Sequence, residues 1–333
     1  MPEGAYEQAG VSQSAADAGV ASLVGELARI DTGERPRTIA LPGHYASVLR
    51  LDQRRGLAIC TDGVGTKLVV AEQLGRWDTV GIDCVAMNVN DLICVGARPL
   101  AMVDYIAVPR ADPDVLGEVG RGLRRGAELA GIEIPGGELA QLGAIVTGLD
   151  LVGAAVGLVD LDAIVTGASV EAGDPVIGLP SSGPHSNGYT LARRALTDVA
   201  PDDDRLGRPL GDLLLEPTEI YVRAVLELLD SPADVRGLAH ITGDGLRNLL
   251  RLEADVGYEI DDPLPVPPLF DLIRKLGDVP EDEMYEVFNM GCGFCCVVAA
   301  ADEEAALELL RTHYPEAKRI GRATGRTGEV VRR

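Results

Sequence analysis

The amino-acid sequence predicts an α/β protein built from two domains. Its 333 residues, 46% of them hydrophobic and 25% charged, are more than a single hydrophobic core comfortably holds. Strand signals alternate with helix signals along the chain, and no internal repeat is present. Together these observations favour two globular α/β units.

Each expected element follows from its local pattern. Apolar and β-branched runs bounded by turn residues predict strands at 56–62, 99–108, 150–160 and 175–180. Apolar residues at helical spacing predict helices at 82–93, 114–132, 189–199, 216–230 and 302–313. Turn residues gather between 162 and 183, so we divide the chain into domains at 1–163 and 164–333.

The helix over 82–93 is expected to be amphipathic. Its apolar residues, at 82, 85, 86, 89, 92 and 93, fall on one stripe. At about 100° per residue, Asp83 and Asn90 share a flank of this helix, while Asp91 lies opposite the stripe. The pattern by itself therefore predicts that Asp91 faces solvent.

Charge argues against two classes of partner. The chain carries 52 acidic and 30 basic residues, which gives a net charge of −22. Nucleic acids and anionic membranes both require basic patches, so neither is an expected partner. An anionic substrate must therefore be met by local donors or by a metal ion. The basic residues include three lysines, and this arginine bias fits a salt-rich cytoplasm and a GC-rich genome equally well.

The cellular compartment follows from the apolar segments. No apolar run reaches about 18 residues, and residues 1–19 contain no basic segment followed by an apolar core. Neither a membrane span nor a signal peptide is expected, and the protein is expected to be cytoplasmic. The six cysteines are then expected to be buried free thiols, because the CxxC at 292–295 lacks a second ligand pair for zinc.

Chemistry-bearing residues gather in short loops that contain glycine. The segment CTDGVGTK (60–67) combines an acid, two glycines and a lysine, in a spacing that matches neither a P-loop nor a dinucleotide fingerprint. Four further loops are PGGELA (135–140), SSGPHSNGY (181–189), HITGDG (240–245) and FNMGCG (288–293). A polar loop before a helix offers free N–H groups to an anion, although an elaborate helix cap explains it equally well. Four such loops in one chain predict convergence on one cleft.

These motifs resemble those of the phosphoribosylformylglycinamidine cyclo-ligase family, also called aminoimidazole ribonucleotide synthetases. The segments TDGVGTK, GIDCVAMNVNDL, PGGE, SSGPHSNGY, HITG and MYEVFNMGCG occur in order, and the likeness extends from 5–11 to 317–321. The resemblance implies two α/β domains, with N-terminal sheets that pair into a barrel across a homodimer and a C-terminal domain that closes the cleft. It implies the fifth step of purine synthesis, in which formylglycinamidine ribonucleotide and ATP give aminoimidazole ribonucleotide, ADP and phosphate through phosphorylation of the formyl oxygen.

The resemblance also implies roles by motif position. Asp62, Asp91 and Glu138 are expected to hold Mg²⁺ on the triphosphate. The residues expected to contact ATP are Asp62, Gly63, Gly65, Thr66, Lys67, Asn90 and Glu138, with Lys67 on phosphate oxygens. The expected catalytic residues are His185, His240 and Asp91, and the expected substrate contacts are Ser182, Gly183, Ser186, Asn187, Thr242 and Asn289. Asp104, inside an apolar strand, is explained equally well as a hydrogen-bonded structural acid or as a ligand.

The sequence departs from the family pattern at a few positions, and two alternatives stay open. Leu139 and Gln141 stand where a hydroxyl and a carboxylate are usual, and Asp244 stands where a third glycine is usual. One alternative is a small-molecule kinase of the same superfamily, similar to thiamine monophosphate kinase, although this does not explain SSGPHSNGY together with FNMGCG. The other is a non-catalytic nucleotide-binding subunit, which a stoichiometric ADP-release assay would distinguish from an enzyme.

Overall fold

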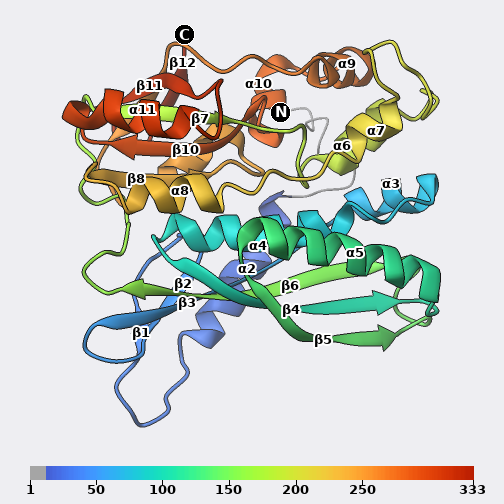
Figure 1. Ribbon diagram of the computed structural model, residues 1–333, viewed down its shortest axis with the longest axis horizontal. Coiled ribbons are helices and arrows are strands. Elements are labelled where there is room, and N and C mark those ends of the chain that lie inside the picture. Colours follow the sequence, from blue (N-terminus) through green and yellow to red (C-terminus); the bar gives the residue numbers. More distant parts are fainter. Residues whose placement is uncertain (1–12) are drawn as a thin grey trace.

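The computed structural model describes residues 13–333 and contains two six-stranded sheets with helices between and beside them (Figure 1). The likeness at 5–11 lies outside the described residues. The N-terminal sheet has the strand order β1-β2-β3-β6-β4-β5 and the C-terminal sheet the order β12-β9-β11-β7-β10-β8. All strands of the first sheet precede those of the second in the chain, so the fold is α/β with two sheet domains, as predicted.

The bounds of the elements are as follows. The N-terminal sheet contains β1 (Thr38–Ile39), β2 (Ser47–Arg50), β3 (Arg55–Gly63), β4 (Arg98–Val108), β5 (Glu133–Gln141) and β6 (Asp150–Asp160). The C-terminal sheet contains β7 (Pro175–Pro180), β8 (Val235–His240), β9 (Gly257–Ile260), β10 (Cys292–Val298), β11 (Lys318–Thr324) and β12 (Val330–Arg332). The α-helices are α2 (Gln13–Leu27), α3 (Lys67–Leu74), α4 (Val80–Cys94), α5 (Pro113–Ala130), α6 (Tyr189–Ala195), α7 (Leu210–Leu214), α8 (Val222–Leu229), α9 (Pro268–Gly277), α10 (Glu281–Val287) and α11 (Glu303–Arg311). Two 3₁₀ helices cover Gly245–Arg251 and Ala300–Asp302.

Most of the predicted elements are confirmed. The four predicted strands are β3, β4, β6 and β7, and the helices predicted at 82–93, 114–132 and 302–313 are α4, α5 and α11. The helix expected over 189–199 ends earlier, and the one expected over 216–230 begins only at Val222. The irregular segment before Val222 donates backbone N–H groups of Thr218 and Tyr221 to side chains of α4 instead.

Local chemistry explains the bounds of α5. The Asp112 carboxylate accepts the N–H groups of Asp114 and Val115 at 2.9 and 3.3 Å, and Pro113 fills the first turn, where no intrahelical N–H bond is lost. Gly131 ends the helix in the left-handed conformation, with φ of 71°. These signals lie within the segment itself, which is why the sequence predicts this helix well.

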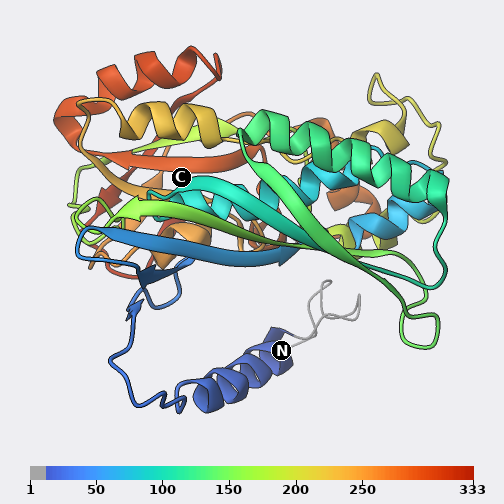
Figure 2. The ribbon, with the colours of Figure 1, turned by 60° about the horizontal axis from the view of Figure 1, so that its bottom comes forward.

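The two faces of the N-terminal sheet differ. Residues of β6 alternate between buried and half-buried, and the buried ones face α4. Gly153 permits this approach, because a Cβ there would lie 2.5 Å from Nδ2 of Asn88 on α4. The opposite, outer face carries the exposed side chains of Ile59, Val103 and Tyr105. In Figure 2, α2 stands apart from the sheet, and its described side chains are exposed.

The helix α4 is buried on nearly every side, which contradicts the expected single apolar stripe. It packs against the N-terminal sheet on one side and against α8 and β8 on the other. Asp83 and Asn90 have no exposed surface, and Asp91 has a side chain that is 15% exposed and contacts His240 of the C-terminal domain. The prediction that Asp91 faces solvent is therefore wrong, because periodicity assumes one buried face and α4 has two.

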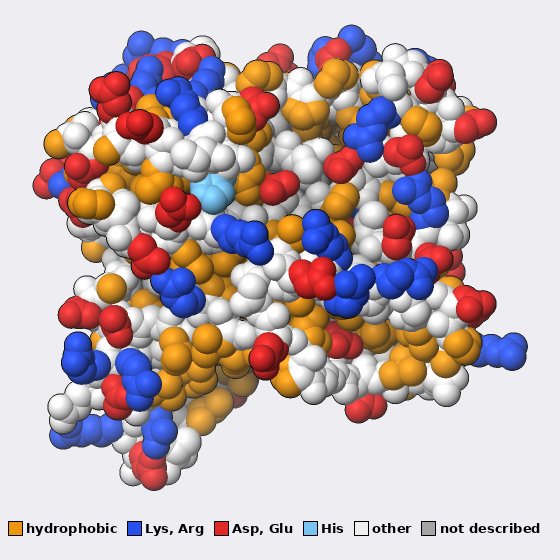
Figure 3. All heavy atoms as spheres, viewed as in Figure 1, with side chains coloured by type: hydrophobic (Ala, Val, Ile, Leu, Met, Phe, Trp, Pro, Cys, Tyr) orange, Lys and Arg blue, Asp and Glu red, His pale blue; other side chains and the backbone are white. Residues whose placement is uncertain are grey.

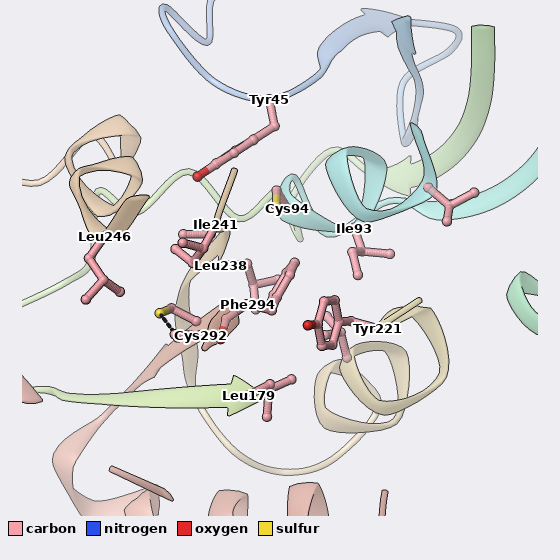
Figure 4. Packing of buried hydrophobic residues seen from close by; sticks show 14 of the residues in the cluster. Tyr45, Ile93, Cys94, Leu179, Tyr221, Leu238, Ile241, Leu246, Cys292 and Phe294 are labelled. Carbon is pink, nitrogen blue, oxygen red and sulfur yellow. Dashed lines mark hydrogen bonds between the residues drawn. The ribbon is translucent and has the colours of Figure 1, made fainter. Parts of the chain in front are cut away.

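The hydrophobic core continues from one domain into the other. Figure 4 shows Ile93 of α4 beside Tyr221 and Phe294, with Leu179 of β7 below them. The rings of Tyr221 and Phe294 pack with centroids 5.3 Å apart. Contact through this core gives the two domains a fixed common surface, which we call the seam.

The cysteines and the surface complete the description of the fold. All six cysteines are free thiols, and five of them are buried, as predicted, whereas Cys60 on β3 is only half-buried. Acidic and basic side chains are interspersed over the face drawn in Figure 3. Within residues 13–333, no helix combines the length and the apolar character needed to cross a bilayer.

Candidate active site

Motif loops that lie far apart in the sequence meet along the seam. A Cβ added to Gly65 would lie 3.9 Å from the backbone oxygen of Ser186, and one added to Gly243 would lie 3.8 Å from Oδ1 of Asn187. The loops 60–67, 181–189 and 240–245 are therefore neighbours. Loop 288–293 joins them through Asn289, whose Nδ2 donates to the Gly183 oxygen at 2.8 Å. The predicted convergence is confirmed for these loops.

Loop 135–140 does not join the others. It forms most of β5, the edge strand of the N-terminal sheet, so the prediction of a loop there is wrong. Glu138 pairs in register with Tyr105, which pairs with Val152, which pairs with Gly63. This row belongs to the outer face, whereas Asp62 belongs to the next row, on the face toward α4. The chain therefore does not bring Glu138 together with Asp62 and Asp91.

Asp62 contacts α4 at Asn88, about one helical turn before Asp91, and we call these two acids the carboxylate pair. Asp62 accepts the Gly63 N–H at 2.7 Å, and Asn88 fixes the Asp62 backbone with two hydrogen bonds of 3.1 Å. Burial, and next the charge of Asp91, raise the pKa of Asp62 to about 6. A cation between the two carboxylates would relieve this repulsion. Among residues 13–333, however, no three His, Cys, Asp or Glu side chains are grouped to hold a metal ion.

His240 is held on both sides by α4. Its Nδ1 lies 2.9 Å from Oδ1 of Asp91, and its Nε2 lies 3.4 Å from Nδ2 of Asn90. Asn90 also donates to the Glu219 oxygen at 2.8 Å and accepts the Tyr221 N–H at 3.1 Å. Asn90 thus ties the two domains together, while Asp91 fixes the orientation of the His240 ring.

His185 is a buried, neutral histidine with one unused nitrogen. Burial lowers its pKa well below the ordinary value, and the nearby His240 and Lys67 lower it further. Its Nε2 accepts the Ser182 N–H at 3.3 Å, so the ring proton is on Nδ1. That Nδ1 has no hydrogen-bond partner within residues 13–333. A donor buried in this way is available to a ligand oxygen.

The other predicted substrate contacts divide into two groups. Asn187 resembles His185, because its buried Nδ2 has no partner among the described residues. Ser182, Thr242 and Asn289, by contrast, already hydrogen-bond to other protein groups. Ser186 Oγ lies 3.1 Å from the hydroxyl of Thr218. The side chains of the second group therefore shape the loops, while His185 and Asn187 carry unsatisfied polar atoms.

All hydrogen-bond donors of the Lys67 ammonium are taken by protein acceptors. Its ammonium has no exposed surface and donates to Oδ1 of Asp83 at 2.8 Å, to the His185 oxygen at 3.0 Å and to the Glu216 oxygen at 2.6 Å. An ammonium has three donors, so none is left for the phosphate contact that the sequence predicts. The neighbouring Thr66 hydroxyl lies 3.2 Å from that of Thr190, so this residue too bridges the seam.

Comparison with known proteins identifies the family. The N-terminal domain model of the AIR synthase related proteins matches residues 43–159, and the C-terminal domain model matches residues 171–333. Phosphoribosylformylglycinamidine cyclo-ligase of Methanothermobacter thermautotrophicus is 50% identical over 333 residues, covering 98% of this chain and 96% of the relative. The chain belongs to the phosphoribosylformylglycinamidine cyclo-ligase family. The cyclo-ligase of Pyrococcus furiosus is 47% identical over 330 residues, covering 98% of this chain and 97% of the relative.

Solved structures resemble this cyclo-ligase family member in fold alone. The HypE–HypF complex matches with a TM-score of 0.64 at 17% identity, covering 87% of this chain and 89% of that chain. Thiamine-monophosphate kinase from Stenotrophomonas maltophilia matches with a TM-score of 0.61 at 22% identity, covering 90% and 92%. At such low identity these matches support the two-domain architecture and do not favour the activity of either protein.

Sequence reasoning on the cyclo-ligase motifs missed Asp83 and Thr218. The Asp83 carboxylate accepts the N–H and the hydroxyl of Thr218, both at 2.7 Å, in addition to the Lys67 ammonium. Asp83 is visible as an acid in the first turn of a helix rich in apolar residues, which could have signalled a buried pair. Thr218 carries no local signal, because its partner lies 135 residues away in the chain.

Proposed function

We propose that the protein converts formylglycinamidine ribonucleotide and ATP into aminoimidazole ribonucleotide, ADP and phosphate. The observation that carries this proposal is the meeting of loops 60–67, 181–189, 240–245 and 288–293 at one seam, in a chain 50% identical to a cyclo-ligase. An amide oxygen is a poor leaving group until it is phosphorylated. The protein therefore needs to orient the formyl group, bind the triphosphate and accept one proton.

The unsatisfied polar atoms at the seam suggest how the substrate is held. His185 Nδ1–H and Asn187 Nδ2 are buried donors without protein partners, and we assign both to oxygen atoms of the substrate. We assign His240, oriented by Asp91, to accept the proton that the amidine nitrogen loses on ring closure. Phosphate then leaves with the electron pair of the former C–O bond.

We further propose that the protein uses Mg²⁺, held by Asp62 and Asp91. Two carboxylates provide the hard oxygen ligands that this ion prefers. Burial, and next the charge of Asp91, raise the pKa of Asp62, and a bound cation would offset both effects. Glu138 does not fit this set within one chain, because it belongs to the outer face of the sheet. When bound, Mg²⁺ neutralises charge on the phosphate oxygens.

We also propose a homodimer formed through the outer face of the N-terminal sheet. Ile59 on β3 and Val103 and Tyr105 on β4 are 40%, 46% and 40% exposed, and the two strands lie on either side of β6. A stable interface buries about 800 Å² per partner, and a flat apolar sheet face can supply this area. Tyr105→Asp should convert the dimer to a monomer in light scattering. Val266→Asp, which alters an exposed valine of the C-terminal domain, should leave the dimer intact.

One experiment tests the reaction and separates it from the kinase alternative. The purified protein should convert formylglycinamidine ribonucleotide to a product with a diazotisable aromatic amine, in the presence of both ATP and Mg²⁺, with one ADP formed per product. Thiamine monophosphate should not be phosphorylated. Phosphorylation of thiamine monophosphate without any cyclised product would contradict the proposed function. Binding of ATP without turnover would favour the non-catalytic alternative.

A further inference from the structure

A second cation lies at the seam, and its donors are unused. Arg251 ends the 3₁₀ helix Gly245–Arg251, which follows loop 240–245 directly. Its guanidinium carbon lies 4.8 Å from the centroid of the Tyr45 ring. Within residues 13–333 the guanidinium forms no ion pair and no hydrogen bond, in contrast to Lys67. Five N–H donors in a planar fork are therefore free.

The platform under Arg251 is rigid and attached to the active-site loops. Tyr45 is 8% exposed, and its hydroxyl donates to the Asn248 oxygen at 3.2 Å. The Asn248 side chain accepts the Thr242 N–H at 2.8 Å and donates to the Gly243 oxygen at 3.0 Å. Tyr45, Arg251 and loop 240–245 thus form one hydrogen-bonded and stacked unit, which joins the two domains.

This unit lies beside the carboxylate pair. Figure 4 shows Tyr45 reaching down toward Ile241, with Cys94 alongside. Ile241 follows His240 in the chain, and Cys94 lies about one helical turn after Asp91 on α4.

We propose that Arg251 binds the phosphoryl group that is transferred from ATP, whereas the family resemblance implies that Lys67 contacts the phosphate oxygens. This inference rests on the proposed function. In the transfer, a bond forms between the formyl oxygen and the γ-phosphorus, and the bond from that phosphorus to the bridging oxygen breaks, so that ADP leaves with the electron pair. Arg251 neither gives nor takes a proton. Its fork matches two phosphoryl oxygens, and Tyr45 keeps the fork in plane.

The test compares substitutions on a single 3₁₀ helix. Arg251→Gln removes the cation, Arg251→Lys keeps the charge without the fork, and Arg247→Gln is the matched control. Arg247 lies on the same helix, is 62% exposed and pairs with Glu286 on the surface. We expect Arg251→Gln to lower kcat by about 10² or more, with the KM for formylglycinamidine ribonucleotide changed less than about threefold. Arg251→Lys should be intermediate, and Arg247→Gln should match the wild type.

Nucleotide binding provides a readout that does not depend on the proposed reaction. Calorimetry with ADP and with the ATP analogue that has a methylene β–γ bridge should show weaker analogue binding in Arg251→Gln, by about tenfold, and unchanged ADP binding. Because ADP lacks the γ-phosphoryl group, loss of a contact to that group should not change ADP binding. Loss of a merely structural residue would weaken the binding of both nucleotides alike. An unchanged kcat, an equal loss for both nucleotides, or a rise confined to the KM of the ribonucleotide would each overturn the proposal. If the wild type forms no cyclised product, the proposed function fails, and the nucleotide comparison still decides the role of Arg251.

Discussion

Replacing Lys67 by methionine distinguishes a structural role of this residue from the phosphate contact predicted by its motif. Lys67 and Asp83 are both fully buried, and burial raises the pKa of Asp83 and lowers that of Lys67 despite their attraction. The ion pair therefore adds little to the free energy of unfolding compared with two apolar residues of similar size. Removal of one partner, however, leaves the other as an unpaired buried charge. In Lys67→Met, the Asp83 carboxylate keeps two hydrogen bonds from Thr218 and has no cation.

The expected loss of stability follows from this geometry. Removing one member of a buried ion pair costs about 3–5 kcal/mol. Because two Thr218 hydrogen bonds remain on Asp83, we expect the lower end, about 3 kcal/mol. Adding Asp83→Asn to Lys67→Met removes the stranded charge, so the double variant should regain about 2 kcal/mol. The two single effects should therefore be strongly non-additive.

The assay is urea unfolding of the wild type, both single variants and the double variant, followed by circular dichroism. The cycle should give a coupling energy of at least about 2 kcal/mol. Lys275→Met is the control, since Lys275 is 63% exposed and pairs with Asp271 on the surface; its effect should stay below about 1 kcal/mol. The structural role is refuted if Lys67→Met unfolds at the wild-type urea concentration and loses affinity for ATP. That result would indicate that Lys67 contacts a phosphate group of ATP.

The remaining predictions concern charge. The folded-state pKa of Asp62 is about 6, against an ordinary value of 3.8, so ionisation of Asp62 at pH 8 destabilises the folded state. Without Mg²⁺ at pH 8, Asp62→Asn should therefore raise the free energy of unfolding by up to about 3 kcal/mol. In urea unfolding this gain should shrink as the pH falls through 6 and vanish below about 4; a gain independent of pH would contradict it. Asp91→Asn should lower turnover about 10²-fold and raise the Mg²⁺ midpoint while the melting curve shows a folded protein; normal turnover with an unshifted midpoint would exclude Asp91 from the site. With a net charge of −22, the melting temperature should rise between 0.1 and about 2 M KCl; a flat response would leave genome composition as the cause of the arginine bias.

Elements whose signals are local could be predicted from the sequence. The strands β3, β4 and β6 and the helix α5 carry their own patterns and caps, and the structure confirms them. The prediction of a loop at 135–140 was wrong because a proline and two glycines usually mark a turn. An edge strand tolerates such residues, and Gly137 is needed there, since a Cβ would lie 2.5 Å from Oδ1 of Asp104.

The site was predictable as a set of loops but not as a set of contacts. Glycine and polar residues marked loops 181–189 and 240–245, and these do meet. The helical pattern alone, by contrast, placed Asp91 in solvent, because periodicity contains no information about a second domain packing on α4, and only the family resemblance placed it in the site. Its partner His240 lies 149 residues away. Contacts across the seam depend on the arrangement of the two domains, which no local pattern encodes.

The two cations at the seam illustrate how side-chain shape divides their roles. Three acceptors converge on Lys67 from Asp83, His185 and Glu216, and a compact ammonium with three donors satisfies them all. A planar guanidinium would not fit three converging acceptors, but it stacks on an aromatic ring, as Arg251 does on Tyr45, and keeps its donors at the edge. The lysine can therefore hold the domains together while the arginine remains available to an anion. For this reason Lys67→Arg should destabilise the seam although it preserves the charge, and urea unfolding should show a loss above about 1 kcal/mol. Wild-type stability in Lys67→Arg would mean that charge alone, and not shape, selects lysine at this position.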